Sequence, residues 1–202
     1  MNEISCNEVE LEGLAASEPA LSHENHGKCF YRFPLLVPRL SGKKDLLPIL
    51  IPEELKGAVF IGEALRLKGQ LRSFNNKSGQ GSRLVLSVYA ATLTPGIGTA
   101  ENRIRLSGTL CKTPSLRRTP LGRNICDLML AVPRRYGRAD YLPVIAWGQL
   151  AGLLAQRGVG DPVSLEGRIQ SRPYTKLTGH GPEERTAYEV SLMHLLEEPV
   201  SE

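Results

Sequence analysis

Apolar and polar residues alternate along much of this chain, with the period of two that is typical of half-exposed β-strands. Residues 102–110 show this well: Ile104 and Leu106 fall on one face, and Arg103 and Arg105 fall on the other. A strand of this kind turns one face to a core and the other to solvent. The alternation therefore predicts a protein built mainly from strands.

The second half of the chain has the pattern of three strands, one helix and two strands. Leu150, Leu153 and Leu154 fall at helical spacing after Gly148, and Gly158 is expected to cap the helix. The expected strands are residues 102–110, 124–134, 141–147, 162–174 and 185–195, with a turn at 112–123 and a hairpin loop near 175–184. This order predicts a mainly all-β domain, the five-stranded Greek-key barrel called the OB-fold, with a short helix between strands 3 and 4.

The first half of the chain repeats the second. Residues 7–48 match residues 102–143 at a constant offset of 95, and 14 of the 42 pairs are identical. Chance would give about one identity in fifteen to twenty pairs at average residue usage. The expected strands of this copy are residues 7–15, 28–39, 45–51, 63–74 and 83–92, with a shortened helix at 53–57. We therefore expect two tandem OB-folds, at residues 1–95 and 102–198, joined by a linker at 96–101.

The composition is that of an ordinary globular protein, with 41% hydrophobic and 23% charged residues. No apolar run approaches the roughly 18 residues that a membrane span needs, and the acidic start MNEISCNEVELEG is unlike a signal peptide. We expect a cytoplasmic protein with reduced cysteines and no membrane partner. His23, His26 and Cys29 could begin a zinc site, but a fourth ligand is not evident, so we expect a polar turn with a buried cysteine and no metal or cofactor.

Basic residues are concentrated in the second copy. Residues 1–95 carry 11 basic and 10 acidic side chains, whereas the remainder carries 14 and 11. Within residues 102–138 nine basic residues face a single acid, Asp127. Solvated surface charge is one reading of such a run, but an excess of this size over neighbouring segments favours a polyanionic partner.

Four segments of the second copy resemble bacterial single-stranded DNA-binding proteins, in the same order as in that family. They are NRIRLSGTLCKTPSLRRTPLGR, LPVIAWGQLAGLL, VSLEGRIQSRPYT and TAYEV. The first copy resembles the family more faintly, in NEVELEG, RLKGQLRSFNN and SGQGSRLVL. The resemblance implies the tandem two-barrel form, in which a homodimer presents four OB-folds. It also implies a nucleoid-associated role in DNA replication, recombination or repair.

The resemblance carries over aromatic residues that would stack on bases. Trp147 stands where the family has an aromatic residue at the end of strand 3, and Tyr141 stands where it has one at the start of that strand. Tyr136 falls near an aromatic residue of the preceding hairpin. Tyr174 matches the aromatic residue that ends the Gln-x-Arg-x-aromatic run. Arg172 is the cation within that run. The wider phosphate contacts would come from Arg103, Arg105, Arg117, Arg118, Arg134, Arg135 and Arg168. Trp147 would instead be a core residue if Ile145, two positions earlier, is buried.

The first copy lacks most of these aromatic residues. Opposite Tyr136, Tyr141, Trp147 and Tyr174 it has Ser41, Leu46, Pro52 and Asn76. Its strand-two aromatics, Phe30, Tyr31 and Phe33, are expected in the core, which leaves Phe74 as the candidate DNA contact of this copy. The first barrel would then bind DNA weakly or serve in assembly.

Stacking on aromatic rings and contacts from Arg or Lys to phosphates are what binding a single strand without reading its sequence requires. This is the function we expect. The alternative is an OB-fold assembly protein of a replication or mobile-element complex that binds nucleic acid weakly. An enzyme is the least favoured class, because the histidines are scattered and the chain has neither a nucleophile with a base nor a phosphate-cradling loop.

Overall fold

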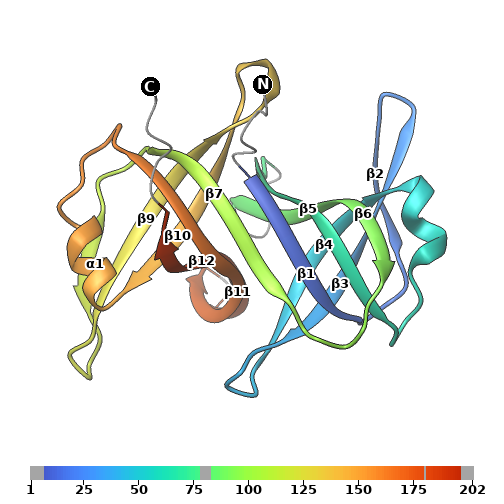
Figure 1. Cartoon of the computed structure of the whole chain (residues 1–202), viewed down its shortest axis with the longest axis horizontal. Coiled ribbons are helices and arrows are strands. Elements are labelled where there is room, and N and C mark those ends of the chain that lie inside the picture. Colours follow the sequence, from blue (N-terminus) through green and yellow to red (C-terminus); the bar gives the residue numbers. More distant parts are fainter. Residues whose placement is uncertain (1–6, 78–82, 180, 197–202) are drawn as a thin grey trace. The chain divides into compact units, whose positions relative to one another are not determined.

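The computed structural model describes residues 7–77, 83–179 and 181–196, most of which lie in strands (Figure 1). The chain divides into two compact units. The N-terminal unit contains Glu8–Arg103 and Gln170–Tyr188. The C-terminal unit contains Ile104–Ile169, the described residues from Glu189 onward and Asn7. We call residues 170–188 the arm. The predicted boundaries at residues 95 and 102 assign the arm to the second copy by sequence, whereas its contacts lie in the N-terminal unit.

The strands of the N-terminal unit close into a barrel. Its elements are β1 (Asn7–Ala15), β2 (Ala20–Asn25), β3 (Lys28–Pro38), β4 (Lys44–Pro52), the 3₁₀ helix η1 (Glu53–Ala58), β5 (Ala64–Asn75) and β6 (Leu84–Pro95). The strand order is β2-β3-β4-β6-β5-β1, and β1 also pairs with β3. Strands β4 and β6 run parallel, and the other paired strands run antiparallel.

The second copy repeats this topology, and the outer parts of its last two strands form the arm. Its elements are β7 (Asn102–Leu110), β8 (Ser115–Arg118), β9 (Asn124–Pro133), the 3₁₀ helix η2 (Arg135–Gly137), β10 (Ala139–Trp147), α1 (Gln149–Leu154), β11 (Pro162–Thr178) and β12 (Gly181–Leu195). The order is β7-β11-β12-β10-β9-β8, and β7 also pairs with β9. Each copy thus has five barrel strands and one additional edge strand, β2 or β8, with a helix between β4 and β5 in the first copy and between β10 and β11 in the second. This arrangement confirms the predicted OB-fold architecture.

Identical residues of the repeat build the two cores. Leu11, Leu35 and Leu47 are fully buried in the first barrel, and their partners at offset 95, Leu106, Leu130 and Leu142, are buried in the second. Gly13 and Gly108 are identical for a different reason. A methyl group added at Gly108 would lie 2.5 Å from the carbonyl oxygen of Ala131, so the strands can approach closely only with glycine there.

The linker after the first barrel is anchored by a buried carboxylate. Glu12 Oε1 accepts hydrogen bonds from the backbone nitrogens of Ile97, Gly98 and Thr99 at 2.8, 2.6 and 2.8 Å. The backbone donor of Thr99 contributes most to holding the pKa of Glu12 below its ordinary value. The predicted linker is therefore a fixed loop that packs on β1.

Two expected loops contain strand. The turn predicted at residues 112–123 includes β8, and the hairpin loop predicted near 175–184 is largely strand, because β11 continues to Thr178 and β12 begins at Gly181. Within this hairpin Thr178 Oγ1 donates to the carbonyl of Gly181 at 2.8 Å. The predictions are wrong because they relied on Gly, Pro and Lys content, and backbone pairing overrides composition in a long hairpin.

The expected helix cap at Gly158 is also wrong. Helix α1 ends at Leu154, and Ala155 occupies the cap position. The next two backbone nitrogens, of Gln156 and Arg157, bond to carbonyls three residues earlier. These bonds satisfy the last carbonyls without a left-handed glycine.

The turn that carries His23, His26 and Cys29, for which a zinc site was the alternative interpretation, makes an aromatic contact in the structure. The ring of His23 stacks on Phe30, with centroids 5.0 Å apart, and Cys29 is half-buried rather than buried. No group of three or more His, Cys, Asp or Glu side chains within the described ranges could hold a metal ion. None of the described helices is long and apolar enough to cross a bilayer.

Candidate nucleic-acid interface

The outer face of β8, β9 and β10 brings together residues that the sequence separates widely. Trp147 on β10 lies opposite Ile125 on β9, and Ile125 lies opposite Arg117 on β8. Directly paired residues of antiparallel strands point to the same side of a sheet. One aromatic and one cationic side chain of the predicted set therefore share a face of the C-terminal barrel.

Trp147 is half-buried and has a cation over its ring. The guanidinium carbon of Arg123 lies 5.1 Å from the ring centroid of Trp147, within the range of a cation–π contact. Ile145 is buried, which by the sequence argument would make Trp147 a core residue. The structure corrects that inference, because Trp147 keeps part of its surface exposed at the edge of the face.

Tyr141 and Tyr136 extend the aromatic set toward the β9–β10 turn. Tyr141 is 48% exposed and shares the outer face of β10 with Trp147, six residues away, a separation of about 20 Å. Tyr136 is 96% exposed within η2, where its φ of 62° is left-handed. A single strand that crosses this face could meet all three rings in succession.

Asp127, the single acid of the basic segment 102–138, forms an ion pair with Arg117, one of the predicted phosphate contacts. Arg117 Nε donates to Asp127 Oδ2 at 2.6 Å, and this bond is the main cause of the raised pKa of Arg117. Arg118 points to the other side of β8 and donates to Asn124 Oδ1 at 3.2 Å. Arg135 is exposed in the turn beside Tyr136. On this face Arg123 is therefore the cation that the structure places at the aromatic ring of Trp147.

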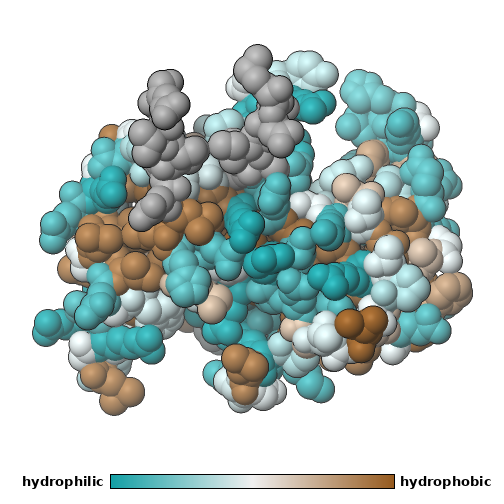
Figure 2. Space-filling model, in the orientation of Figure 1, coloured by the Kyte–Doolittle hydropathy of each residue, from teal (hydrophilic) through white to brown (hydrophobic). Residues whose placement is uncertain are grey.

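Arg103 and Arg105 lie on β7 and form ion pairs there. Arg103 Nη2 donates to Glu10 Oε2 at 2.7 Å, and Arg105 Nε donates to Glu166 Oε2 at 2.7 Å. Figure 2 shows the hydrophilic surface over β1 and β5, to which Glu10 and Lys68 belong. Arg168 lies on β11, the strand that pairs with β7. Phosphate binding by these three arginines stays a prediction, and two of the three already have carboxylate partners.

Arg134 has a structural partner. Its Nη1 lies 3.5 Å from Oδ1 of Asp140, which is fully buried. The corresponding residues of the first copy, Arg39 and Asp45, form the same pair, with Nε to Oδ2 at 2.7 Å. Because this pair is conserved between the two copies, we assign Arg134 first to the fold. Its contact with DNA stays a prediction.

The remaining predicted contacts belong to the N-terminal unit. Tyr174 and Arg172 are in the arm, where Tyr174 is half-buried near Arg185 and Arg172 is exposed. Phe74 ends β5 opposite Val85 and is 52% exposed. Contact of Tyr174, Arg172 and Phe74 with DNA stays a prediction.

The N-terminal barrel has an aromatic cluster on the corresponding face, which the sequence comparison missed. Phe30 stacks on His23 and lies 6.4 Å from Tyr89, centroid to centroid. Phe30 occupies the repeat position of Ile125, and it pairs across strands with Pro52, which occupies the position of Trp147. The aromatic residue of the first barrel thus lies on β3, whereas that of the second barrel lies on β10, the counterpart of β4. Of the strand-two aromatics expected in the core, Phe33 is buried, but Phe30 and Tyr31 are half-buried.

Similarity to known proteins is strong in the second half of the chain. The sequence profile described as "Single-strand binding protein family" matches residues 101–196. Residues 101–196 of this chain are therefore similar to that family. The resemblance noted in the sequence is therefore confirmed, and the match covers β7 to β12.

Relatives in this family match only part of their own length. Single-stranded DNA-binding protein 2 of Streptococcus agalactiae serotype V is 32% identical over 82 residues, which cover 37% of this chain and 63% of that protein. The single-stranded DNA-binding protein of Thermus thermophilus is 36% identical over 89 residues, which cover 42% of this chain and 34% of that protein. This chain thus spans less than two thirds of the length of either relative.

A solved structure extends the similarity to both halves. The wild-type single-stranded DNA binding protein from Thermus aquaticus matches 97% of this chain and 94% of its own, with a TM-score of 0.77 and 23% identity. At that identity the match shows the fold, and it shows it for the N-terminal barrel as well as for the C-terminal one.

Proposed function

We propose that this protein binds single-stranded DNA without reading its sequence, as a coat in replication, recombination or repair. The observation that carries the proposal is the arrangement of Trp147, with Arg123 over its ring, on the outer face of a barrel whose sequence matches the single-strand binding protein family. The names of the relatives state the same substrate.

The chemistry of this face suits a single strand. Every base has a π-face, so stacking tolerates any sequence and contributes about 1 to 3 kcal/mol per base. Trp147 and Tyr141 offer partly exposed rings on one strand, and the Arg123 guanidinium, which lies at the Trp147 ring, would meet a phosphate beside a stacked base. Stacking and charge together need no hydrogen-bond readout of base edges.

The finer features follow from the family. We propose a homodimer that presents four barrels, a cytoplasmic and nucleoid-associated location, and a binding role without catalysis. Sedimentation equilibrium or light scattering of the full chain tests the first of these, with twice the mass of 22.1 kDa expected.

Fluorescence anisotropy with a labelled oligothymidine tests the function. Each neutralised phosphate should contribute about −0.7 to the slope of log K against log salt, so we expect a steep slope and weak competition by duplex DNA of equal length. Absence of binding at low salt would refute the function. Weak binding with a flat slope would favour an assembly protein instead.

A further inference from the structure

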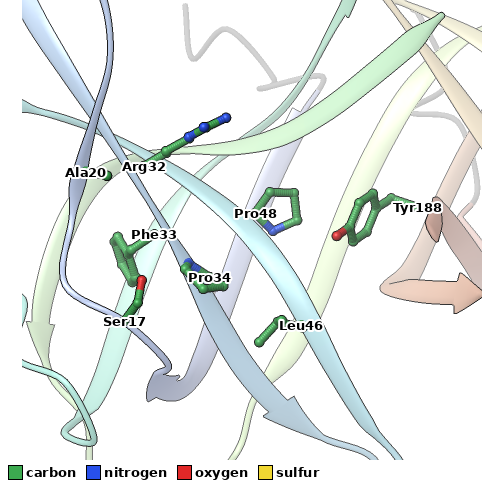
Figure 3. Close-up of a pocket in the computed structure, with 8 residues that line it drawn as sticks. All are labelled: Ser17, Ala20, Arg32, Phe33, Pro34, Leu46, Pro48 and Tyr188. Carbon is green, nitrogen blue, oxygen red and sulfur yellow. The ribbon is translucent and has the colours of Figure 1, made fainter. Parts of the chain in front are cut away.

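The N-terminal unit contains an apolar pocket of about 240 Å³ that lies apart from the family-like face (Figure 3). It is lined by Ser17, Ala20, Arg32, Phe33, Pro34, Leu46, Pro48 and Tyr188. Figure 3 shows Tyr188 on one side, Phe33 and Pro34 on the other, and Leu46 and Pro48 between them. Most of the lining is apolar, and Arg32 supplies the only full charge among these eight residues.

The position of the pocket in the barrel is informative. Pro34 on β3 pairs directly with Pro48 on β4, so the two share one side of the sheet. Their counterparts at offset 95, Met129 and Pro143, are paired in the same way on the outer face of β9 and β10. The pocket therefore lies on the face of the first barrel that corresponds to the DNA-binding face proposed for the second.

The arm supplies one wall of the pocket and is held in place by a buried carboxylate. Ser171 donates from its backbone nitrogen and its hydroxyl to Asp45 Oδ1, at 2.7 and 2.9 Å. Arg39 Nη2 donates to the carbonyl oxygen of Ser171 at 2.9 Å. Because Asp45 and Arg39 belong to the β3–β4 hairpin, these bonds fix the arm, and with it Tyr188, against the first barrel.

The residues beside the pocket point to the class of its occupant. Phe30, Arg32 and Pro34 alternate along β3 and face the same side, so the stacked pair of Phe30 and His23 lies next to Arg32. An aromatic platform, a cation and an apolar slot with a tyrosine wall follow one another along a single strand. That order matches a nucleic-acid strand, with a base on a ring, a phosphate on a guanidinium and the next base in a slot.

We propose that this pocket binds one unstacked nucleobase of single-stranded DNA, with Tyr188 against the base and Arg32 at the adjoining phosphate. The site is composite, because the barrel supplies β3 and β4 and the arm supplies Tyr188. The proposal rests on the proposed function, of which it is a second and separate contact surface. It also gives the first barrel a direct role that its lack of tryptophan does not predict.

Photo-cross-linking of the full chain tests the proposal directly. An oligothymidine substituted with 5-iodo-2′-deoxyuridine is bound, irradiated and mapped by mass spectrometry. We expect cross-links at Tyr188 as well as at Trp147. Cross-links confined to residues 104–169 would overturn the pocket while leaving the proposed function intact, and no binding of the oligonucleotide would refute the function itself.

Substitutions provide a second test. Tyr188→Ala and Arg32→Ala should each weaken binding of a long oligothymidine by about fivefold or more, whereas Tyr188→Phe should keep the affinity. Leu177→Ala, on an exposed position of the same arm, and Arg157→Ala, an exposed arginine after α1, are the matched controls. Equal affinities for Tyr188→Ala and Leu177→Ala would contradict the proposal. An apolar peptide that binds in the pocket without competing with the oligonucleotide would also contradict it.

Discussion

Arg39 donates hydrogen bonds to both carboxylate oxygens of Asp45, and the same two residue types meet again 95 positions later as Arg134 and Asp140. Asp45 and Asp140 are both fully buried. Burial opposes ionisation of Asp45, but the bonds from Arg39 and Ser171 outweigh it and hold its pKa below the ordinary value. The pair fixes the hairpin of each barrel, and in the first barrel it also holds the arm.

Breaking this pair should destabilise the protein strongly. Asp45→Asn leaves the Arg39 guanidinium without its carboxylate, and removing one partner of a buried pair costs about 3 to 5 kcal/mol. Because Arg39 is 19% exposed, we expect the lower end of that range in urea denaturation. Glu166→Gln, which breaks the more exposed pair with Arg105, is the control and should cost at most about 1 kcal/mol. Equal losses in the two variants would contradict this assignment.

Glu10 should make stability depend on pH in the acid range. Hydrogen bonds from Lys68 and Arg103 lower the pKa of Glu10 from 4.5 to about 2. Since the folded pKa lies below the unfolded one, the contribution of Glu10 is complete above about 4.5 and is lost as the pH falls toward about 2. In a pH series of urea denaturation, Glu10→Gln should flatten this part of the profile. Glu8→Gln, exposed on the same strand, should leave the slope as it is.

Gly108→Ala should destabilise the second barrel by about 1 to 3 kcal/mol, because the new methyl group would overlap the carbonyl of Ala131. Gly152→Ala in α1 is the matched control. A methyl group at Gly152 meets nothing within 4 Å, and alanine favours a helix over glycine by up to about 1 kcal/mol. In thermal denaturation the unfolding midpoint should therefore fall for Gly108→Ala and rise or stay the same for Gly152→Ala. A neutral Gly108→Ala would show that β7 and β9 do not approach as closely as described.

The strand pattern was sufficient to predict the barrels, because both cores use the alternation of period two. Strands β1 and β7 have the predicted bounds, and Leu11 and Leu106 are buried as their identity in the repeat suggests. The short edge strands β2 and β8 were missed, since neither buries a residue and so neither carries an apolar pattern. The arm was missed because its contacts depend on Ser171 meeting Asp45, 126 positions away.

The site was predicted less well, because the comparison of the two copies did not include the pairing between β3 and β4. Comparison at offset 95 sets Trp147 against Pro52 and finds no aromatic residue at that position of the first copy. The structure pairs Pro52 with Phe30, so the aromatic residue is present on the neighbouring strand. Cross-strand pairing is a property of the fold, and a comparison of single positions does not detect it. Arg123 was missed similarly, although its place in the turn directly before β9 could have suggested it.

Arg123 should matter more for DNA binding than the arginines that are paired on β7. Arg123→Ala removes the cation from beside Trp147, and we expect the slope of log K against log salt to fall by about 0.7. Arg105→Ala leaves a surface whose charge was already balanced by Glu166, so its slope should change less. Titration of both variants with oligothymidine at several salt concentrations measures the difference. A larger effect for Arg105 would move the binding path to β7.

Titration of the intrinsic fluorescence of Trp147 with oligothymidine tests the central claim most directly, because Trp147 is the single tryptophan of the chain. We expect saturable quenching as a base stacks on the indole. We also expect Trp147→Ala to lose about 1 to 3 kcal/mol of binding free energy, measured by anisotropy, while its circular dichroism stays that of the wild type. Tight binding without any change in the fluorescence, together with an unchanged affinity of Trp147→Ala, would contradict the claim that this face binds the strand by stacking.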